Sequence, residues 1–395
     1  MSTSTAYSQS GGTVSQSNKF YISTADDESA VYVTGGGTLN LNNLTIKKTG
    51  DTSNRDNSNF YGLNAAVLAD EASTITIAGG TVYTDGSGTN GVFATGDGTM
   101  VTLKNVVVDC NGEVAHGLDA TVAGTLVAAN CTVTTTGSHA AAIATDRGGG
   151  YVTFTGGKAI THGLVSPGLY STGEITVSDA TIVAKVAECA VIEGFNSIVV
   201  TDSSLTGSTC GAQIYQSMSG DASVGTGQFT MTGGSLTVTD GPAFYVTNTD
   251  AVIILKDVTL TVGDGTILKA SANSTWGTSG SNGGIVTFTA DAQDLEGDIT
   301  VDDISTADIT LQNGSSLKGV INAGNTAKSV TLTMDTASTW SLIADSYLST
   351  FTDSNTEFTN IDDNGFNIYY DSLTGVDTGE YALPGGGTLL PKAAV

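Results

Sequence analysis

Histidines are rare among the residues that could carry chemistry in this chain of 395 residues, which contains three of them. His116 and His139 occupy matching positions in successive copies of an internal repeat, which would stack them within reach of a shared metal ion. A zinc site needs three or four ligands, and no cysteine or carboxylate falls in the same column. We therefore expect an exposed pair of turn residues without a metal, and no catalytic triad around His162.

Paired aspartates are the next candidates, because a glycoside hydrolase needs two carboxyl groups roughly 5 to 9.5 Å apart. Asp302–Asp303 and Asp362–Asp363 are the candidate pairs. A uronate lyase would need clustered basic groups, yet the only two arginines lie in different repeats. Aspartate near a turn ordinarily caps it, so we predict no catalytic residue. The oxygen-rich composition allows calcium as a cofactor, but predicts no specific metal site.

The four cysteines bear on the redox compartment. Cys189 and Cys210 fall at equivalent points of adjacent repeats, where stacking at about 4.8 Å lies inside the Cα separation of about 4.4 to 6.8 Å that a disulfide needs. This spacing predicts a Cys189–Cys210 bridge, and two buried thiols are the alternative. Cys110 and Cys131 are offset by four positions, so we expect no bridge between them.

Three segments exceed the basic repeat length and are interpreted as inserted loops: Lys48 to Phe60, Gln216 to Gly227, and Ala270 to Gly284. Insertions in repeat proteins often carry the binding face. The last two flank Tyr215, Tyr245 and Trp276, which we predict to bind a ligand, because aromatic rings serve as platforms for sugars or partner chains. The alternative is that Trp276 folds over Tyr245 and holds its loop on the surface.

Charge and hydropathy exclude several classes of partner. The net charge is −26, which disfavours binding to nucleic acid or to an anionic membrane surface. The longest apolar runs span only a few residues, so no membrane insertion is expected. The start, MSTSTAYSQSGG, lacks a basic and then apolar signal segment. We therefore expect either a cytosolic protein or a mature form whose signal peptide has been removed.

Apolar residues recur along the chain every 23 to 36 residues. Aligned repeats give a column whose members are all apolar: Leu39, Ile75, Val101, Leu126, Val152, Ile175, Ile198, Phe229, Ile253, Val286, Ile309 and Leu332. A second apolar column follows two residues later, usually with Thr between, which predicts strands with one buried face. Turn pairs such as Gly79–Gly80 and Asn42–Asn43 fit a corner with a left-handed backbone.

The remainder of each repeat holds a third strand-like piece, such as HGLDAT at 116 to 121. Three short strands per turn of about 23 residues predict an all-β fold, a single right-handed parallel β-helix of about 12–13 coils. Residues 1–37 would form an N-terminal capping coil, 38–337 the β-helix, and 338–395 the closing coils and tail.

These columns resemble those of secreted bacterial β-helix proteins of the adhesin and autotransporter-passenger type. STWSLIADSYLSTF (338 to 351) and TNIDDNGFNIYYD (359 to 371) resemble the closing coils of pertactin-like passengers. The resemblance implies an extracellular or cell-surface protein with an adhesive or structural display role. Its partner would be a glycan, an extracellular matrix protein or another copy of itself. A carbohydrate-active β-helix enzyme is the alternative, and a groove holding three or more carboxylates with a Lys or Arg would favour it.

Overall fold

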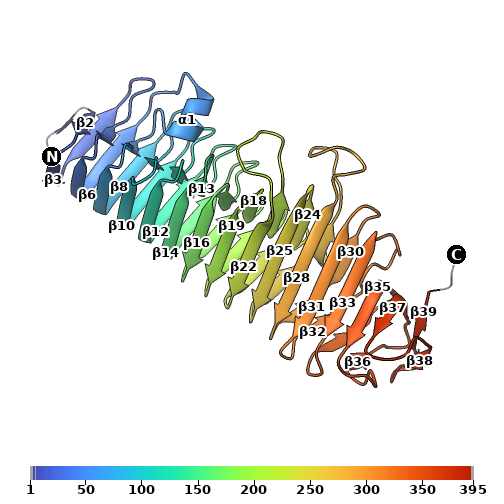
Figure 1. Ribbon diagram of the computed structural model, residues 1–395. Helices are drawn as coiled ribbons and strands as arrows, with labels where there is room; N and C mark the ends of the chain where they lie inside the picture. Colours follow the sequence, from blue (N-terminus) through green and yellow to red (C-terminus); the bar gives the residue numbers. More distant parts are fainter. Residues whose placement is uncertain (1–2, 5, 393–395) are drawn as a thin grey trace. The chain divides into compact units, whose positions relative to one another are not determined.

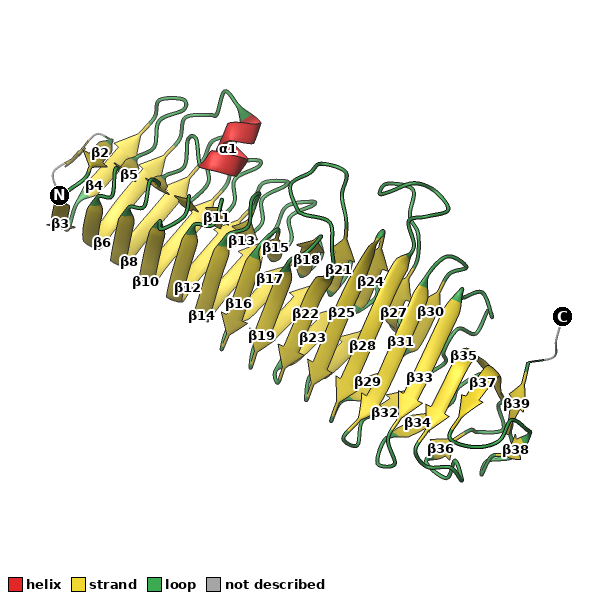
Figure 2. Ribbon diagram, viewed as in Figure 1, coloured by secondary structure: helices red, strands yellow, loops and turns green. Residues whose placement is uncertain are grey.

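The computed structural model describes residues 3–4 and 6–392, and it confirms the predicted all-β class. Strand accounts for 53% of the structure and helix for 2%, and parallel strands stack into a β-solenoid of about 15 turns (Figure 2). The chain divides into two compact units, residues 1–208 with 219–223, and residues 209–218 with 224–395.

The first unit carries one short helix outside its stacked strands, α1 (Arg55–Tyr61) (Figure 1). Its strands are β1 (Thr3–Ser4), β2 (Tyr7–Ser10), β3 (Thr13–Ser17), β4 (Phe20–Ser23), β5 (Val31–Thr34), β6 (Thr38–Lys48), β7 (Val67–Ala69), β8 (Thr74–Thr84), β9 (Val92–Thr95), β10 (Met100–Cys110), β11 (Leu118–Thr121), β12 (Thr125–Thr135), β13 (Ile143–Thr145), β14 (Tyr151–Thr161), β15 (Leu169–Ser171), β16 (Glu174–Ser178), β17 (Thr181–Ala184), β18 (Ala190–Glu193), β19 (Ser197–Thr201) and β20 (Ser204–Gly207). We call the sheet formed by β2, β5, β7, β9, β11, β13, β15 and β18 the short-strand sheet.

The second unit has the same stacking, and its last strand pair, β38 with β39, is antiparallel. Its strands are β21 (Ala212–Tyr215), β22 (Gly227–Thr232), β23 (Ser235–Val238), β24 (Phe244–Thr247), β25 (Thr249–Lys256), β26 (Thr259–Val262), β27 (Thr266–Ala270), β28 (Gly284–Asp291), β29 (Asp294–Glu296), β30 (Asp298–Val301), β31 (Thr306–Gln312), β32 (Ser316–Lys318), β33 (Ser329–Met334), β34 (Thr339–Ser341), β35 (Ser346–Asp353), β36 (Ile361–Asp362), β37 (Ile368–Thr374), β38 (Tyr381–Ala382) and β39 (Thr388–Pro391).

The predicted apolar column lies in the core, and every member is at most 2% exposed. The pairing matches the alignment in the first unit, where Leu39 pairs with Ile75 and Ile75 with Val101. One repeat of the second unit was aligned wrongly by two residues, because Ile253 pairs with Phe288 rather than with Val286. The long insertion just before β28 removed the local spacing that fixed the alignment elsewhere.

Both ends add coils beyond the 12–13 that the columns predicted. Before residue 38, β3 and β4 both pair in parallel with β6, and β2 pairs with β5. Near the other end, β37 pairs in parallel with β35 and then with β39. At the N-terminal end one inward position is polar, Gln9 in β2, whereas β37 and β39 keep apolar inward residues such as Ile368 and Leu389.

The predicted left-handed corners are confirmed, but in five coils the corner does not separate two strands as expected. Asn43, Gly79 and Asn105 have φ values of 52°, 70° and 54°. In β6, β8, β10, β12 and β14 the corner bends the chain without ending the ladder, so that two of the three expected strands run as one strand of 11 residues.

Each predicted insertion lies between strands where it was expected. The first follows β6 and contains α1, whose start is capped by Asn54 Oδ1, which accepts the Asn57 N–H at 3.0 Å. The third occupies residues 271–283, between β27 and β28. Among the described residues, no helix has both the length and the hydrophobicity that crossing a bilayer would require.

Candidate functional site: a groove beside helix α1

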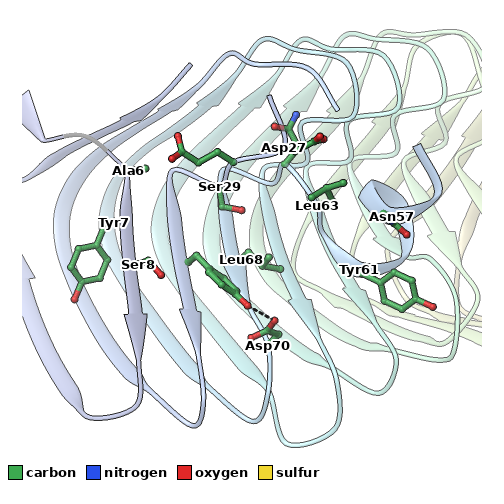
Figure 3. Close-up of a pocket in the computed structure, with 13 residues that line it drawn as sticks. Ala6, Tyr7, Ser8, Asp27, Ser29, Asn57, Tyr61, Leu63, Leu68 and Asp70 are labelled. Carbon is green, nitrogen blue, oxygen red and sulfur yellow. Dashed lines mark hydrogen bonds between the residues drawn. The ribbon is translucent and has the colours of Figure 1, made fainter. Parts of the chain in front are cut away.

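A groove of about 620 Å³ opens beside α1 in the first unit (Figure 3). Its lining combines three tyrosines, three carboxylates and two asparagines with small and apolar side chains: Ala6, Tyr7, Ser8, Asp27, Glu28, Ser29, Tyr32, Asn57, Tyr61, Leu63, Asn64, Leu68 and Asp70. Pockets that pair aromatic or apolar walls with a few polar groups are the usual form of small-ligand sites. We therefore treat this groove as the candidate functional site.

The first inserted segment forms one wall of the groove because it packs closely on the short-strand sheet. Gly62 ends α1 with φ 71°, and a Cβ there would lie 2.6 Å from Leu68 Cδ1 and 2.7 Å from the Phe93 ring. Only glycine allows this approach. Asn90 Nδ2 also donates to the Ser58 carbonyl at 2.9 Å. The helix is thereby held against the sheet, with Tyr61, 52% exposed, at the groove.

Tyr32 and Asp70 are the central polar pair of the groove. Tyr32 Oη donates to Asp70 Oδ2 at 2.8 Å, the contact drawn as a dashed line in Figure 3. Burial, together with the neighbouring carboxylate of Asp70, raises the pKa of Tyr32, so the phenol keeps its proton and remains a donor.

One carboxylate of the groove, Asp27, holds the inserted segment in place. Ser53 donates to Asp27 from its hydroxyl and from its backbone N–H, the latter at 2.8 Å, and these bonds lower the pKa of Asp27. Glu28 Oε2 accepts the Ser23 hydroxyl at 2.7 Å. The groove thus holds three carboxylates, but none of its lining residues is Lys or Arg. Of the two features that would favour a carbohydrate-active enzyme, the groove has the carboxylates but lacks the basic residue.

The three residues predicted to bind a ligand lie in the second unit, and two of them are in contact. The rings of Tyr215 and Trp276 are stacked, with centroids 4.9 Å apart and planes at 27°. The predicted neighbour, Tyr245, instead has Lys269 Nζ 5.1 Å from its ring centroid. The strand register explains why Trp276 meets Tyr215 and not Tyr245. Tyr215 pairs with Thr247, and the Thr247 hydroxyl donates at 3.5 Å to a carbonyl of the 271–283 loop.

Hydrogen bonds to the backbone of Trp276 also fix the shape of the 271–283 loop. Asn273 Oδ1 accepts its N–H at 2.8 Å, and Asn282 Nδ2 donates to its carbonyl at 2.8 Å. The ring stacked on Tyr215 favours the alternative in which Trp276 holds the loop on the surface, but the partner is Tyr215 and not the predicted Tyr245. Ligand binding by Tyr215, Tyr245 and Trp276 stays a prediction.

The disulfide predicted between Cys189 and Cys210 is not formed, because all four cysteines are buried thiols. Cys189 Sγ lies 4.0 Å from the Ile182 carbonyl within its own coil and serves as a small core side chain. The four-residue offset of Cys131 and Cys110 is confirmed, since Cys110 pairs with Thr135.

Both aspartate pairs considered for catalysis contain turn-capping residues. Asp302 Oδ2 accepts the Ala272 N–H at 2.7 Å. Asp363 Oδ1 accepts the N–H groups of Gly365 and Gly387 at 2.8 Å each. Asp362 accepts the Ser341 hydroxyl at 3.1 Å. The absence of a catalytic role for these pairs stays a prediction.

A second group of chemically capable side chains lies at the short-strand sheet. His116, Asp119 and Asp146, here the His–Asp cluster, each place a nitrogen or oxygen within 4.8 Å of the others. The expectation of an exposed His116–His139 pair is wrong for His116, which is 6% exposed, whereas His139 is exposed. Burial raises the pKa of Asp119 to about 8.

Sequence reasoning missed both the groove and the cluster for identifiable reasons. Tyr32 precedes Leu39, where the alignment starts, and Asp70 lies between the aligned residues Leu39 and Ile75. Neither residue was therefore placed in a column. Alternation in HGLDAT puts Leu118 inward and Asp119 outward, which indicates an exposed aspartate. In the structure Asp119 is fully buried, and the inserted segment contacts the same sheet at Phe93 and Thr121.

Comparison of the chain with protein-family models, curated proteins and solved structures gave no match. The chemistry of the site itself is therefore the basis for a functional proposal.

Proposed function

We propose that this protein is a non-catalytic, extracellular or cell-surface β-solenoid with an adhesive or display role, and that it binds a saccharide in the groove beside α1. The observation that carries the proposal is the lining of that groove. Tyr7, Tyr32 and Tyr61 offer flat rings for the apolar faces of sugars, and Asp70 and Asn57 offer acceptors and donors for hydroxyl groups.

The charge of the groove narrows the ligand class. Three carboxylates without a lining Lys or Arg disfavour uronates and sulfated sugars, because like charges repel at close range. Neutral sugars and amino sugars fit this lining. The proposal thereby keeps the glycan expected from the sequence and places its binding at the first inserted segment.

A glycan array followed by titration calorimetry tests this proposal, in buffer with Ca²⁺ and again with a chelator. We expect binding of neutral or amino sugars, weakened about 2- to 10-fold by Tyr61→Ala through loss of ring contact. Tyr151→Ala is the matched control, because Tyr151 is 46% exposed in the same unit and lies outside the groove lining.

Trp276→Ala separates the groove from the aromatic pair of the second unit. Unchanged binding agrees with the groove, whereas loss of binding by Trp276→Ala but not by Tyr61→Ala moves the site to Tyr215 and Trp276. Failure to bind any glycan removes the adhesive proposal and leaves a structural, self-associating solenoid.

A carbohydrate-active enzyme is the second candidate, favoured by the three carboxylates in one groove. Incubation with pectin, alginate and glycosaminoglycans, followed by reducing ends and unsaturated-uronate absorbance, tests it. Sustained turnover that Asp70→Asn abolishes would replace the non-catalytic proposal.

A further inference from the structure

The His–Asp cluster has the donor atoms of a metal site. The hydrogen bonding of the His116 imidazole indicates, however, that the cluster binds a proton and not a metal ion. The Ala141 N–H donates to His116 Nδ1 at 3.0 Å, so the lone pair of Nδ1 is occupied. The hydrogen of the neutral ring therefore lies on Nε2, which is 3.7 Å from Asp146 Oδ2. A protonated nitrogen has no lone pair for a metal ion, so Nε2 faces the carboxyl groups as a donor.

The two carboxyl groups of the cluster need a proton between them. Asp119 is fully buried, and its Oδ1 accepts the Asp146 N–H at 3.2 Å. Its Oδ2 is also buried and has no hydrogen-bond partner. Burial, together with the nearby carboxylate of Asp146, raises the pKa of Asp119, so Asp119 is the group that holds a proton. This proton removes one negative charge and makes an Asp119 oxygen a donor.

The cluster lies beside the contacts that hold the inserted segment. Thr121, two residues after Asp119, donates from its hydroxyl to the Phe60 carbonyl at 2.8 Å. Arg147, which follows Asp146, places its guanidinium carbon 4.2 Å from the centroid of the Phe60 ring.

Asn90 adds a third link between the cluster and α1. Its Oδ1 accepts the backbone N–H of His116 at 2.7 Å, and its Nδ2 donates to the Ser58 carbonyl of α1.

We propose that His116, Asp119 and Asp146 form a buried proton-binding site that keeps the α1 segment docked, so that losing this proton releases the segment. Release of the segment on proton loss is independent of what the groove binds. The strands around the cluster are held in parallel ladders that continue on both sides of β11 and β13. The inserted segment is outside these ladders and is therefore the element that is released.

Other charged groups near the cluster do not replace the proton. The residues paired with Asp119 from β9 and β13 are Phe93 and Ala144, which do not titrate. The Arg147 guanidinium is engaged by Phe60 and by Asp221 at 3.4 Å. Further along the sheet, the carboxylate of Glu193 accepts the Tyr170 hydroxyl at 3.1 Å.

The pH dependence follows from linkage. The pKa of Asp119 is raised when the segment is docked and returns toward about 3.9 when the site opens to water. Docking is therefore most favourable below about pH 4, weakens by up to about tenfold per pH unit as pH rises to about 8, and is constant above that value.

Hydrogen exchange of the α1 amides, residues 57–62, measures this release in wild type and in Asp119→Asn at each pH from 5 to 9. Asparagine keeps the shape of the side chain without its charge, and comparison at equal pH cancels the intrinsic exchange rate. We expect the wild-type rate divided by the variant rate to rise with pH to about 8 and then level off. An arginine-specific protease gives a second readout, because the chain has only two arginines and one is Arg55 in α1.

Two outcomes overturn the proposal. One is a ratio that does not change with pH, with equal cleavage after Arg55 in both proteins. The other is a rise in wild-type melting temperature with added Zn²⁺ or Mn²⁺ that Asp119→Asn abolishes, which makes the cluster a metal site. Circular dichroism at pH 5 checks that Asp119→Asn folds. Asp146→Asn, which removes the other carboxyl group, is expected to flatten the same pH dependence.

Discussion

Along β16, Thr176 and Val177 are neighbours in the chain but have opposite environments. Val177 is fully buried, whereas Thr176 is exposed. Each lies in a parallel ladder, Val177 between Phe154 and Val200. A side chain of the core column therefore has apolar neighbours above and below it as well as across the coil.

Replacing Val177 with Asp should lower the free energy of unfolding by about 3–5 kcal/mol, because the buried carboxylate has no partner. Thr176→Asp introduces the same side chain one residue away and should change stability by no more than about 0.5 kcal/mol. Urea denaturation of both variants measures the difference. Equal destabilisation would contradict the assignment of inward and outward faces.

At the scale of elements, the segment after β37 folds back and is held by one carboxylate. Asp363 is buried and accepts N–H groups from Gly365, Gly385 and Gly387. Burial opposes ionisation of Asp363, but these backbone donors outweigh it and lower its pKa. A Cβ at Gly387 would lie 1.8 Å from the Phe366 carbonyl oxygen, so glycine is required there.

Asp363→Asn should loosen the segment from β38 to β39 by about 1–3 kcal/mol, the usual range for hydrogen bonds to a charged group. Because the pKa is lowered, the ionic contribution is present above about pH 4 and is lost as pH falls through the folded value. Hydrogen exchange of residues 381–390 at pH 7 and pH 3 measures it. Asp362→Asn is the control and should leave exchange unchanged, since Asp362 binds only a serine hydroxyl here.

At the scale of the whole molecule, the four thiols are distributed over both units and all are buried. Burial raises the pKa values of Cys110 and Cys189 to about 12. Thiolates are therefore scarce at neutral pH, and the native protein should react slowly with thiol reagents.

We expect four thiols to titrate with Ellman's reagent after unfolding and almost none before it. A reducing agent should leave the melting temperature unchanged, because no covalent cross-link is present to break. A non-reduced mass lower by two hydrogens, with a melting temperature that falls on reduction, would show instead that the predicted Cys189–Cys210 bridge forms. Mass spectrometry and thermal melting make both measurements.

The amino-acid sequence by itself determined the parallel solenoid, because the apolar columns from Leu39 onward repeat at the spacing of stacked coils and the corner positions need Asn or Gly. It also located the inserted segments, since extra length is visible without a structure. Which side chains meet was decided only by the tertiary structure. The segment of residues 48–62 packs on the short-strand sheet at Phe93 and Thr121, and Trp276 reaches Tyr215 while the 271–283 loop is hydrogen-bonded to Thr247. Both outcomes depend on how a loop packs on a surface, and the repeat period carries no information about that packing.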